Sequence, residues 1–295
     1  MVRVLISGAT GLIGTELAKQ LKELGHTPVR LVRRAPKNTD EIFIDASQGK
    51  LDFSVMDTID AVVNLAGATT GKIPWTKKYM KEIVDSRLET TRLLVEAINS
   101  SNNPPKVLVS GSASGIYGDR GDELLDEDSG KGEGFLSDLA FAWEEEAKKA
   151  KTRVVLIRTT MVMSKKLGAL GKLLPLIKLG VGGPLGSGKQ WWAWISLEDQ
   201  ARAIIHLIEN KQATGAYNIT APEPATCEQI VRALGKALHR PTLFRVPAWL
   251  MNLVIGVAAK ELLLCSQKMS AEKLISSGYK FNHPTLRGVV EYVVS

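Results

Sequence analysis

The sequence predicts an α/β fold, a doubly wound parallel sheet that carries a smaller, mostly helical C-terminal lobe. Two observations predict the sheet: apolar runs rich in β-branched residues alternate with helical patterns, and these runs are apolar on both faces, as strands between two helix layers are. A change of pattern after Met161 predicts the lobe. A chain of 295 residues is long enough for both parts.

The elements of the sheet follow one another through the first half of the chain. The first strand covers 2–7, and a helix over 11–24 follows it and ends at Gly25, a residue typical of a left-handed cap. The remaining elements are expected as strands over 29–32, 42–44, 60–67, 106–112 and 153–160, with helices over 76–100 and 136–150.

Segments of the second half of the chain are expected to belong partly to the lobe and partly to the main sheet. Residues 168–196 read as a helix, a glycine-rich loop and a short strand, whereas a helix over 198–209 and a strand over 215–220 are expected to return to the main sheet. Thr226 and Gln229 have the spacing of a capping box and begin a further helix. The expected division is a sheet domain over 1–163 and 196–221, and a lobe over 164–195 and 222–295.

Composition argues against several classes of protein. The net charge is +7, but the lysines and arginines are spread along the chain, so nucleic acid is not expected as the principal ligand. Cys227, Cys265 and the four histidines lack metal-ligand spacing, so neither a metal site nor a disulfide framework is expected. The apolar stretch 246–259 is too short to span a bilayer and predicts a core helix. With no charged leader at the N-terminus, the sequence favours a cytoplasmic protein without membrane contact.

The turn after the first strand carries glycines at 8, 11 and 14. Glycines at this spacing let the chain turn tightly, let backbone N–H groups approach a pyrophosphate, and let the helix pack against the strand. Because the turn joins a buried strand to an amphipathic helix, we expect it to bind a dinucleotide. The contacts expected here come from Gly8, Thr10, Gly11, Leu12, Ile13 and Gly14.

Two arginines, Arg33 and Arg34, end the second strand. In dinucleotide-binding folds this position lies beside the adenosine ribose, where a carboxylate accepts the hydroxyls of NAD and repels a 2′-phosphate. Guanidinium groups pair well with phosphate instead, which favours NADP(H) as the cofactor. The alternative interpretation is a solvated strand end.

Further motifs carry a resemblance to a known superfamily. "NLAG" (64–67) ends one strand, "SGSASGIYG" (110–118) follows another, and "IR" (157–158) lies in a third. With the glycine pattern they resemble an extended, atypical short-chain dehydrogenase/reductase of the NAD-dependent sugar-nucleotide epimerase type. Longer stretches such as "FLSDLAFAWEEEA" and "VPAWLMNLVIGVAAKELLL" resemble its epimerase-like subfamily, whose C-terminal domain has no known function. Members are named nucleoside-diphosphate-sugar epimerases or cell-division inhibitors.

The resemblance implies a set of cofactor contacts beyond the glycine turn. Arg87 is expected to face the phosphates or the ribose, and the alternative for it is a surface salt bridge with Glu82 or Asp85. The whole implied set is Leu65, Ala66, Gly67, Glu82, Arg87, Ser110 and Val162.

The chain departs from the superfamily at its catalytic residues. Members use a serine or threonine with Y-x-x-x-K, and Ser112 stands where the catalytic hydroxyl is expected. In the matching helix, however, Phe135 or Leu136 replaces tyrosine, and Leu139 or Ala140 replaces lysine. Tyr117, in the loop after the fifth strand, is the candidate for handling the proton; the alternative is a structural lid residue.

The loop 182–194 combines glycines, a cation and three tryptophans. Backbone N–H groups and a cation suit a phosphate, and indoles suit a base or sugar, so Lys189, Gln190 and Trp191 are candidate substrate contacts. The alternative is a loop whose tryptophans pack the lobe onto the sheet.

The sequence leaves two functions open. One is an NADP(H)-dependent oxidoreductase or epimerase-like protein that acts on a small or nucleotide-linked substrate in a cleft between sheet and lobe. The other is a catalytically weak or inactive NADPH-binding protein that regulates or scaffolds. Either is compatible with a homodimer.

Overall fold

The structure, a computed structural model, describes residues 1–165 and 170–295. Its centre is an eight-stranded sheet with the strand order β11-β8-β6-β5-β1-β2-β3-β4. All neighbouring pairs are parallel except β3 with β4. The strands are β1 (Arg3–Ser7), β2 (Thr27–Val32), β3 (Glu41–Asp45), β4 (Lys50–Leu51), β5 (Ala61–Asn64), β6 (Val107–Ala113), β8 (Arg153–Thr159) and β11 (Gly215–Ile219). This confirms the predicted fold class.

The strand order reverses beside β1, in the middle of the sheet. From β1 the chain builds β2 and β3 on one side, then returns to place β5 on the other side, with Ile6 opposite Arg30 in β2 and Val63 in β5. Ligands of such sheets bind at the carboxyl ends of the strands where the order reverses. The loop after β1 therefore lies at the expected binding position.

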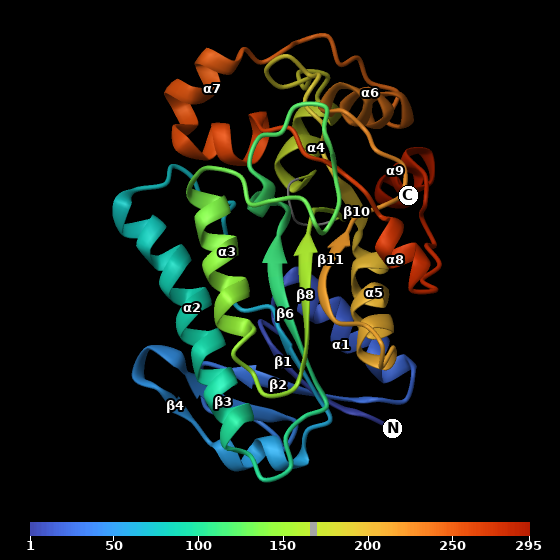
Figure 1. Ribbon diagram of the computed structural model, residues 1–295. Helices are drawn as coiled ribbons and strands as arrows, with labels where there is room; N and C mark the ends of the chain where they lie inside the picture. The colour runs from blue at the N-terminus through green and yellow to red at the C-terminus, as the bar shows by residue number, and fades with distance from the viewer. Residues whose placement is uncertain (166–169) are drawn as a thin grey trace.

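Two helix layers cover the sheet (Figure 1). Helices α1 (Leu12–Glu23) and α5 (Leu197–Glu209) cover one face, and α2 (Lys77–Ser100) and α3 (Phe135–Ala147) cover the other. The alternation of side chains along β1 separates the two cores, because Val4 and Ile6 pack with α1 and α5 whereas Leu5 packs with α2. Burial on both faces explains why these strands are apolar throughout.

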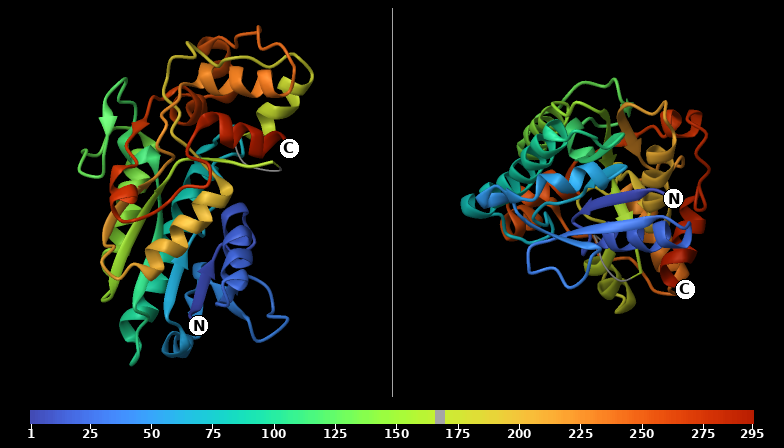
Figure 2. Two further views of the ribbon diagram at one scale, coloured as in Figure 1. Left: turned by 90° about the vertical axis from the view of Figure 1, so that its right-hand side faces the viewer. Right: turned by 90° about the horizontal axis from the view of Figure 1, so that it is seen from below.

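The mostly helical C-terminal part lies beyond the carboxyl ends of the strands (Figure 2). Its core contains Met163, Trp192, Trp194, Ile230 and Val289. Thr226 and Gln229 form the predicted capping box at the start of α6. The helices are α4 (Leu170–Lys178), α6 (Cys227–Ala237), α7 (Ala248–Ile255), a π-helix (Ala259–Leu264), α8 (Glu272–Ser276) and α9 (Leu286–Val294). Two short parallel pairs, β9 (Met161–Met163) with β10 (Trp194–Ser196) and β7 (Leu124–Leu125) with β12 (Lys268–Met269), connect this part to the sheet domain.

The stretch 246–259 does form a helix, α7, but the prediction of a core helix is wrong. Met251 is the buried residue of α7, whereas Trp249 is 68% exposed and Leu253 is 77% exposed. Hydropathy alone does not distinguish an apolar helix in a core from one on a surface, and here the described residues leave one face of α7 uncovered. No helix among the described residues has the length and apolar content needed to cross a membrane.

Candidate functional site

The glycine turn after β1 is closely packed. Gly8 has φ +69°, and a Cβ there would lie 2.6 Å from the Leu65 carbonyl oxygen at the end of β5. A Cβ at Gly14 would lie 2.3 Å from the Gly8 carbonyl oxygen, so glycine lets α1 approach the turn. The amide of Gly11 closes the turn by donating to the Gly8 carbonyl at 3.0 Å. The tight turn and the close approach of α1 are two of the uses of glycine that the sequence pattern predicts.

The amino end of α1 presents unpaired backbone donors. Its N-cap is Gly11, which has no side chain, and the first helical bond runs from the Thr15 amide to the Gly11 carbonyl at 2.9 Å. The amides of Leu12 and Ile13 have no acceptor among the described residues. Thr10 is exposed beside them. Free N–H groups at the positive end of a helix form a place for an anion.

A buried polar network holds the end of β5 against this turn. The Ser7 hydroxyl donates to Asn64 Oδ1 at 2.5 Å and accepts the amide of Leu65 at 3.1 Å. Asn64 Nδ2 and the Trp143 indole N–H both donate to Thr91 Oγ1 at 2.8 Å. The network fixes the "NLAG" segment, and sequence reasoning missed Thr91 and Trp143 because they come from two other helices.

Arg87 reaches from α2 to the same edge of the sheet. Its Nη1 donates to the carbonyls of Ala68 at 3.1 Å and Ile83 at 2.9 Å, and its guanidinium lies 5.2 Å from the centre of the Trp143 ring. A Cβ at Gly67 would come within 2.8 Å of Arg87 Cζ, so glycine makes room for this side chain.

Arg87 has no carboxylate partner among the described residues. Asp85 pairs with Lys81 instead, and Glu82 is exposed, so the alternative of a surface salt bridge is not observed. Burial lowers the pKa of Arg87 to about 10, which leaves it charged at neutral pH. An uncompensated cation therefore lies at the carboxyl end of β5.

The two arginines after β2 differ in their surroundings. Arg34 forms a two-pronged ion pair with Glu41 at 2.7 Å for both bonds. The hydrogen bond from Arg34 lowers the pKa of Glu41 to about 2. Arg33 is exposed and has no polar partner among the described residues. Of the pair, Arg33 is the side chain free to meet an anion.

Ser112 lies in a buried ionic network. Its hydroxyl donates to Glu144 Oε1 at 2.6 Å, and Arg158 pairs with the same carboxylate at 2.9 Å through Nε and 3.1 Å through Nη2. Burial lowers the pKa of Arg158, but the hydrogen bonds and charge interactions with Glu144 and Tyr117 together outweigh burial, so the pKa of Arg158 is raised. Ser110, on the same strand, is fully buried, and Val162 in β9 is half-buried.

The geometry of Tyr117 does not match the predicted role of proton donor in the cleft. The side chain is fully buried, its hydroxyl accepts a hydrogen bond from Arg158 Nη1 at 2.8 Å, and it lies 2.7 Å from Asn218 Oδ1. Burial raises the pKa of Tyr117 to about 12. A neutral, internally bonded phenol matches the alternative of a structural residue, because its donor and acceptor are used within the protein.

Apolar side chains pack at the positions where the resemblance would place the relay. Leu136 is 8% exposed and Ala140 is 2% exposed. Leu136 packs in a cluster with Trp75, Tyr79, Ile83, Leu139 and Ala258, and Phe135 meets the edge of Trp75 at 5.6 Å between ring centres.

A carboxylate from the lobe caps the same helix. Glu261 accepts the amides of Phe135 at 3.2 Å and Leu136 at 3.1 Å, at a helix start where Gly134 supplies no side chain. An N-terminal carboxylate satisfies orphan donors and complements the helix dipole. No local sequence signal could have revealed this cap, because Glu261 lies 125 residues from Leu136.

The three residues predicted to contact the substrate differ in their exposure and in their hydrogen bonds. Lys189 is exposed and makes no side-chain contact with a polar group among the described residues. Gln190 is buried and donates from Nε2 to the carbonyls of Leu185 and Leu263, both at 3.0 Å, so its amide anchors the loop. The Trp191 indole donates to Asp122 Oδ1 at 2.6 Å.

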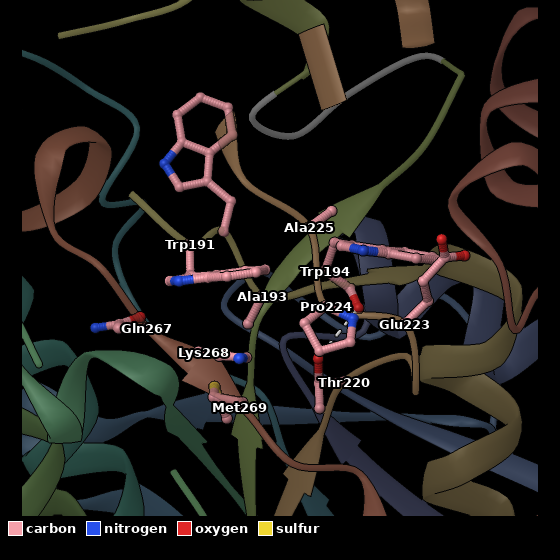
Figure 3. A pocket seen from close by; sticks show the side chains of 11 residues that line it. Trp191, Ala193, Trp194, Thr220, Glu223, Pro224, Ala225, Gln267, Lys268 and Met269 are labelled. Carbon is pink, nitrogen blue, oxygen red and sulfur yellow. Dashed lines mark hydrogen bonds between the residues drawn. The ribbon is translucent and has the colours of Figure 1, made fainter. Parts of the chain in front are cut away.

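Trp191 also lines a small pocket between the loop, residues 220–225 and residues 267–269 (Figure 3). The pocket is too narrow to enclose a water molecule, and Lys268 Nζ lies 4.6 Å from the centre of the Trp191 ring. Trp194 is 1% exposed, as a core residue is, although its indole N–H finds no partner in the described part of the chain. Among the described residues no cluster of His, Cys, Asp and Glu could hold a metal ion.

Comparison with known sequences identifies relatives over the whole chain. Residues 4–220 match the NAD dependent epimerase/dehydratase family, and residues 246–293 match a domain of unknown function, DUF1731. An epimerase family protein of Mycobacterium leprae is 35% identical over 99% of this chain and 95% of its own length. The epimerase family protein SDR39U1 of Bos taurus is 36% identical over 100% of both chains.

Solved structures of epimerase-family proteins are also similar to this chain. The crystal structure of human SDR39U1 (isoform 2) with NADPH has a TM-score of 0.90 and 33% identity, covering 99% of this chain and 98% of that one. The UDP-glucuronic acid 4-epimerase of Bacillus cereus, in complex with UDP-glucuronic acid and NAD, has a TM-score of 0.76 at 19% identity, covering 99% of both chains. At that identity the likeness concerns the fold alone.

Proposed function

The chain belongs to the NAD dependent epimerase/dehydratase family, and from that membership we propose that it binds NADPH at the carboxyl edge of its sheet. The geometry of the glycine turn is the single observation that carries the proposal. A Cβ at Gly8 would clash with the Leu65 carbonyl oxygen, and one at Gly14 with the Gly8 carbonyl oxygen, so glycine permits the tight turn in which backbone N–H groups would approach a pyrophosphate.

Each charged group has a task in this proposal. The free amides of Leu12 and Ile13 would hold the pyrophosphate. Arg87, whose positive charge has no carboxylate partner among the described residues, would supply a cation beside it. Leu65, Ala66 and Gly67 would line the adenosine side, while Thr10, Glu82, Ser110 and Val162 stay predicted contacts. The likeness to an NADPH-bound relative supports the choice of NADPH over NADH.

Arg33 carries the cofactor preference. It is exposed without a polar partner among the described residues, whereas Arg34 is held by Glu41. We expect Arg33→Ala to weaken NADPH by about 10- to 100-fold, the effect of one charge-assisted bond, and to leave NADH nearly unchanged. Arg34→Ala should weaken NADPH less. Calorimetry with both nucleotides measures this, with Lys50→Ala in β4 as the matched control. An equal loss for NADPH and NADH would contradict the assignment to the 2′-phosphate.

We propose that the protein reduces or epimerises a small or nucleotide-linked substrate. When bound, the nicotinamide would supply the hydride chemistry, and the protein would supply binding and orientation. A protein of the same fold was crystallised with UDP-glucuronic acid, so nucleotide-linked compounds are the first to test. Lys189 and Trp191 remain candidate contacts to such a substrate, whereas the buried amide of Gln190 supports a structural role.

A second candidate function is an NADPH-binding protein with weak or no catalysis. One observation favours it: Leu136 and Ala140 fill the relay positions with apolar packing, and the hydroxyls of Ser112 and Tyr117 bond within the protein. A positioned acid or base typically contributes 10²- to 10⁴-fold in rate, so its loss would leave slow chemistry.

Single-turnover absorbance of bound NADPH separates the two functions. An enzyme should oxidise the nucleotide with at least one member of a panel of carbonyl compounds and sugar nucleotides, faster than a solution without protein. Tight NADPH binding with no oxidation by any compound would favour the second function. Both functions include the predicted cytoplasmic location.

A further inference from the structure

We propose that the exposed face of α7 docks the protein on an anionic phospholipid surface. The face, called here the α7 surface, consists of Leu243, Phe244, Trp249, Leu253, Val254 and Val257. Their exposed fractions are 81%, 62%, 68%, 77%, 67% and 51% in that order. Trp249, Leu253 and Val254 lie on α7, Leu243 and Phe244 precede it, and Val257 follows it. Single exposed apolar residues are ordinary, but several large ones within and beside one short helix mark an interaction site.

The spacing of the residues within α7 places the largest of them on one side. Trp249 and Leu253 are four residues apart in the helix, so they share one side, whereas Met251 faces the protein at 3% exposure. Val257 follows Gly256, which ends the helix with φ +68°. Figure 1 shows α7 at the end of the molecule opposite β4. An exposed apolar helix side with tryptophan suits insertion into a bilayer interface.

The charges around the α7 surface indicate which partner it binds. No Asp or Glu occurs in residues 229–260, which contain the α7 surface, or in 147–197, which contain α4. Lys178, Arg240 and Lys260 flank the surface; all three are exposed and none forms an ion pair with a described residue. Gly180, two residues after Lys178, lies near Pro241, which brings the end of α4 beside the chain leading to Phe244.

The imbalance extends to the whole lobe. Residues 164–195 and 222–295 carry fourteen lysines and arginines against five acidic residues, whereas the rest of the chain has a small negative balance. The net charge is therefore less evenly spread than the sequence first indicated. Basic side chains beside an apolar helix face complement anionic lipid headgroups. A second copy of the chain is less suited, because it would bring two sets of unpaired cations together.

This inference revises the prediction of no membrane contact, which rested on the absence of a spanning segment. A helix lying in the interface needs neither the length nor the hydropathy of a spanning helix. Trp249 suits the headgroup level, where tryptophan is enriched.

Flotation of the full-length protein with vesicles tests the proposal. We expect binding to mixed phosphatidylcholine–phosphatidylglycerol vesicles, weaker binding to phosphatidylcholine alone, and a loss of affinity as salt rises. Trp249→Ser with Leu253→Ser and Val254→Ser should abolish binding. Leu24→Ser with Phe141→Ser, at exposed apolar positions of the sheet domain, should not change it.

Two further measurements separate charge from folding effects. Replacing Lys178, Arg240 and Lys260 by Gln should weaken binding at least about tenfold, whereas the same change at Lys22, Lys50 and Lys211 should have little effect. Trp249 is the most exposed of the six tryptophans, so Trp249→Phe should keep flotation but remove the fluorescence blue shift on vesicles.

Three results would overturn the proposal. The protein could fail to float with the mixed vesicles, or the serine variant could float as well as the parent. Sedimentation could instead reveal a dimer that the serine variant dissociates while vesicles stay unbound, which would assign the α7 surface to a second copy. None of these readings depends on NADPH binding, so the proposed function is tested separately.

Discussion

Arg87 and Arg158 differ in one respect that matters for function, the presence of a counter-charge. Arg158 is buried against Glu144, so its charge is compensated within the protein. Arg87 is half-buried, donates to two carbonyls and has no carboxylate among the described residues. A desolvated charge without a partner is costly, and such groups concentrate where a ligand supplies the opposite charge.

Replacing each arginine by methionine should therefore give opposite results. Arg87→Met should leave the free energy of unfolding within about 1 kcal/mol of the parent, because it removes an uncompensated charge, yet weaken NADPH by about 10- to 100-fold. Arg158→Met should cost about 3–5 kcal/mol, because it leaves Glu144 buried and unpaired. Chemical denaturation and nucleotide titration measure both. If Arg87→Met were as destabilising as Arg158→Met, Arg87 would be structural.

Gly14 tests the packing of α1 against the turn. A Cβ would lie 2.3 Å from the Gly8 carbonyl oxygen and 2.8 Å from Ala9 Cα, and backbone atoms cannot yield as a flexible side chain does. We expect Gly14→Ala to cost about 1–3 kcal/mol, the range for overpacking, and to weaken nucleotide binding by displacing the turn. Gly130→Ala, where a Cβ would meet nothing within 4 Å, is the control and should be close to neutral in denaturant titration. Equal stability of the two variants would contradict the packing argument.

At the scale of elements, α3 depends on a residue from the other part of the chain. Its first turn begins after Gly134, which offers no capping side chain, and the Glu261 carboxylate from the π-helix accepts two of its amides. The cap therefore connects the lobe to α3 of the sheet domain.

Removing this cap should loosen the start of α3. Glu261→Ala is expected to cost about 0.5–2 kcal/mol, the range for a lost N-cap, and to speed amide exchange in residues 135–139. Glu261→Gln keeps an acceptor without the charge and should lie between alanine and the parent. The matched control is Glu272→Ala in the first turn of α8, which should leave exchange in α3 unchanged. Unaltered exchange at Phe135 and Leu136 in Glu261→Ala would show that the cap does not stabilise the helix.

For the molecule as a whole, local patterns predicted the sheet and the glycine turn, because both depend on residues near in sequence. The strand periodicity, the turn after β1 and the capping box of Thr226 and Gln229 are of this kind. Tertiary contacts decided the rest. The ion pair between Arg34 and Glu41, the inward hydroxyl of Tyr117 and the cap from Glu261 join residues whose proximity no short pattern encodes. The exposure of α7 likewise depends on tertiary packing, because no described element covers its outer side.

The uneven charge of the molecule predicts a difference in how its two parts respond to salt. The lobe carries fourteen basic against five acidic residues, so its like charges repel one another, while the sheet domain is nearly balanced. Added salt screens repulsion between exposed charges over about 10 Å at 0.1 M, which should stabilise the lobe more than the sheet.

We expect amide exchange in α6 and α9 to slow markedly between low and moderate ionic strength, whereas exchange in β1, β5 and β6 stays nearly constant. Replacing Lys178, Arg240 and Lys260 by Gln should reduce the salt response of the lobe, since fewer charges remain to be screened; the same change at Lys22, Lys50 and Lys211 should not. Exchange mass spectrometry on the free protein measures both responses. A uniform response along the chain would mean that the excess positive charges of the lobe lie too far apart to repel one another. It would also remove the electrostatic argument that the α7 surface docks on an anionic membrane.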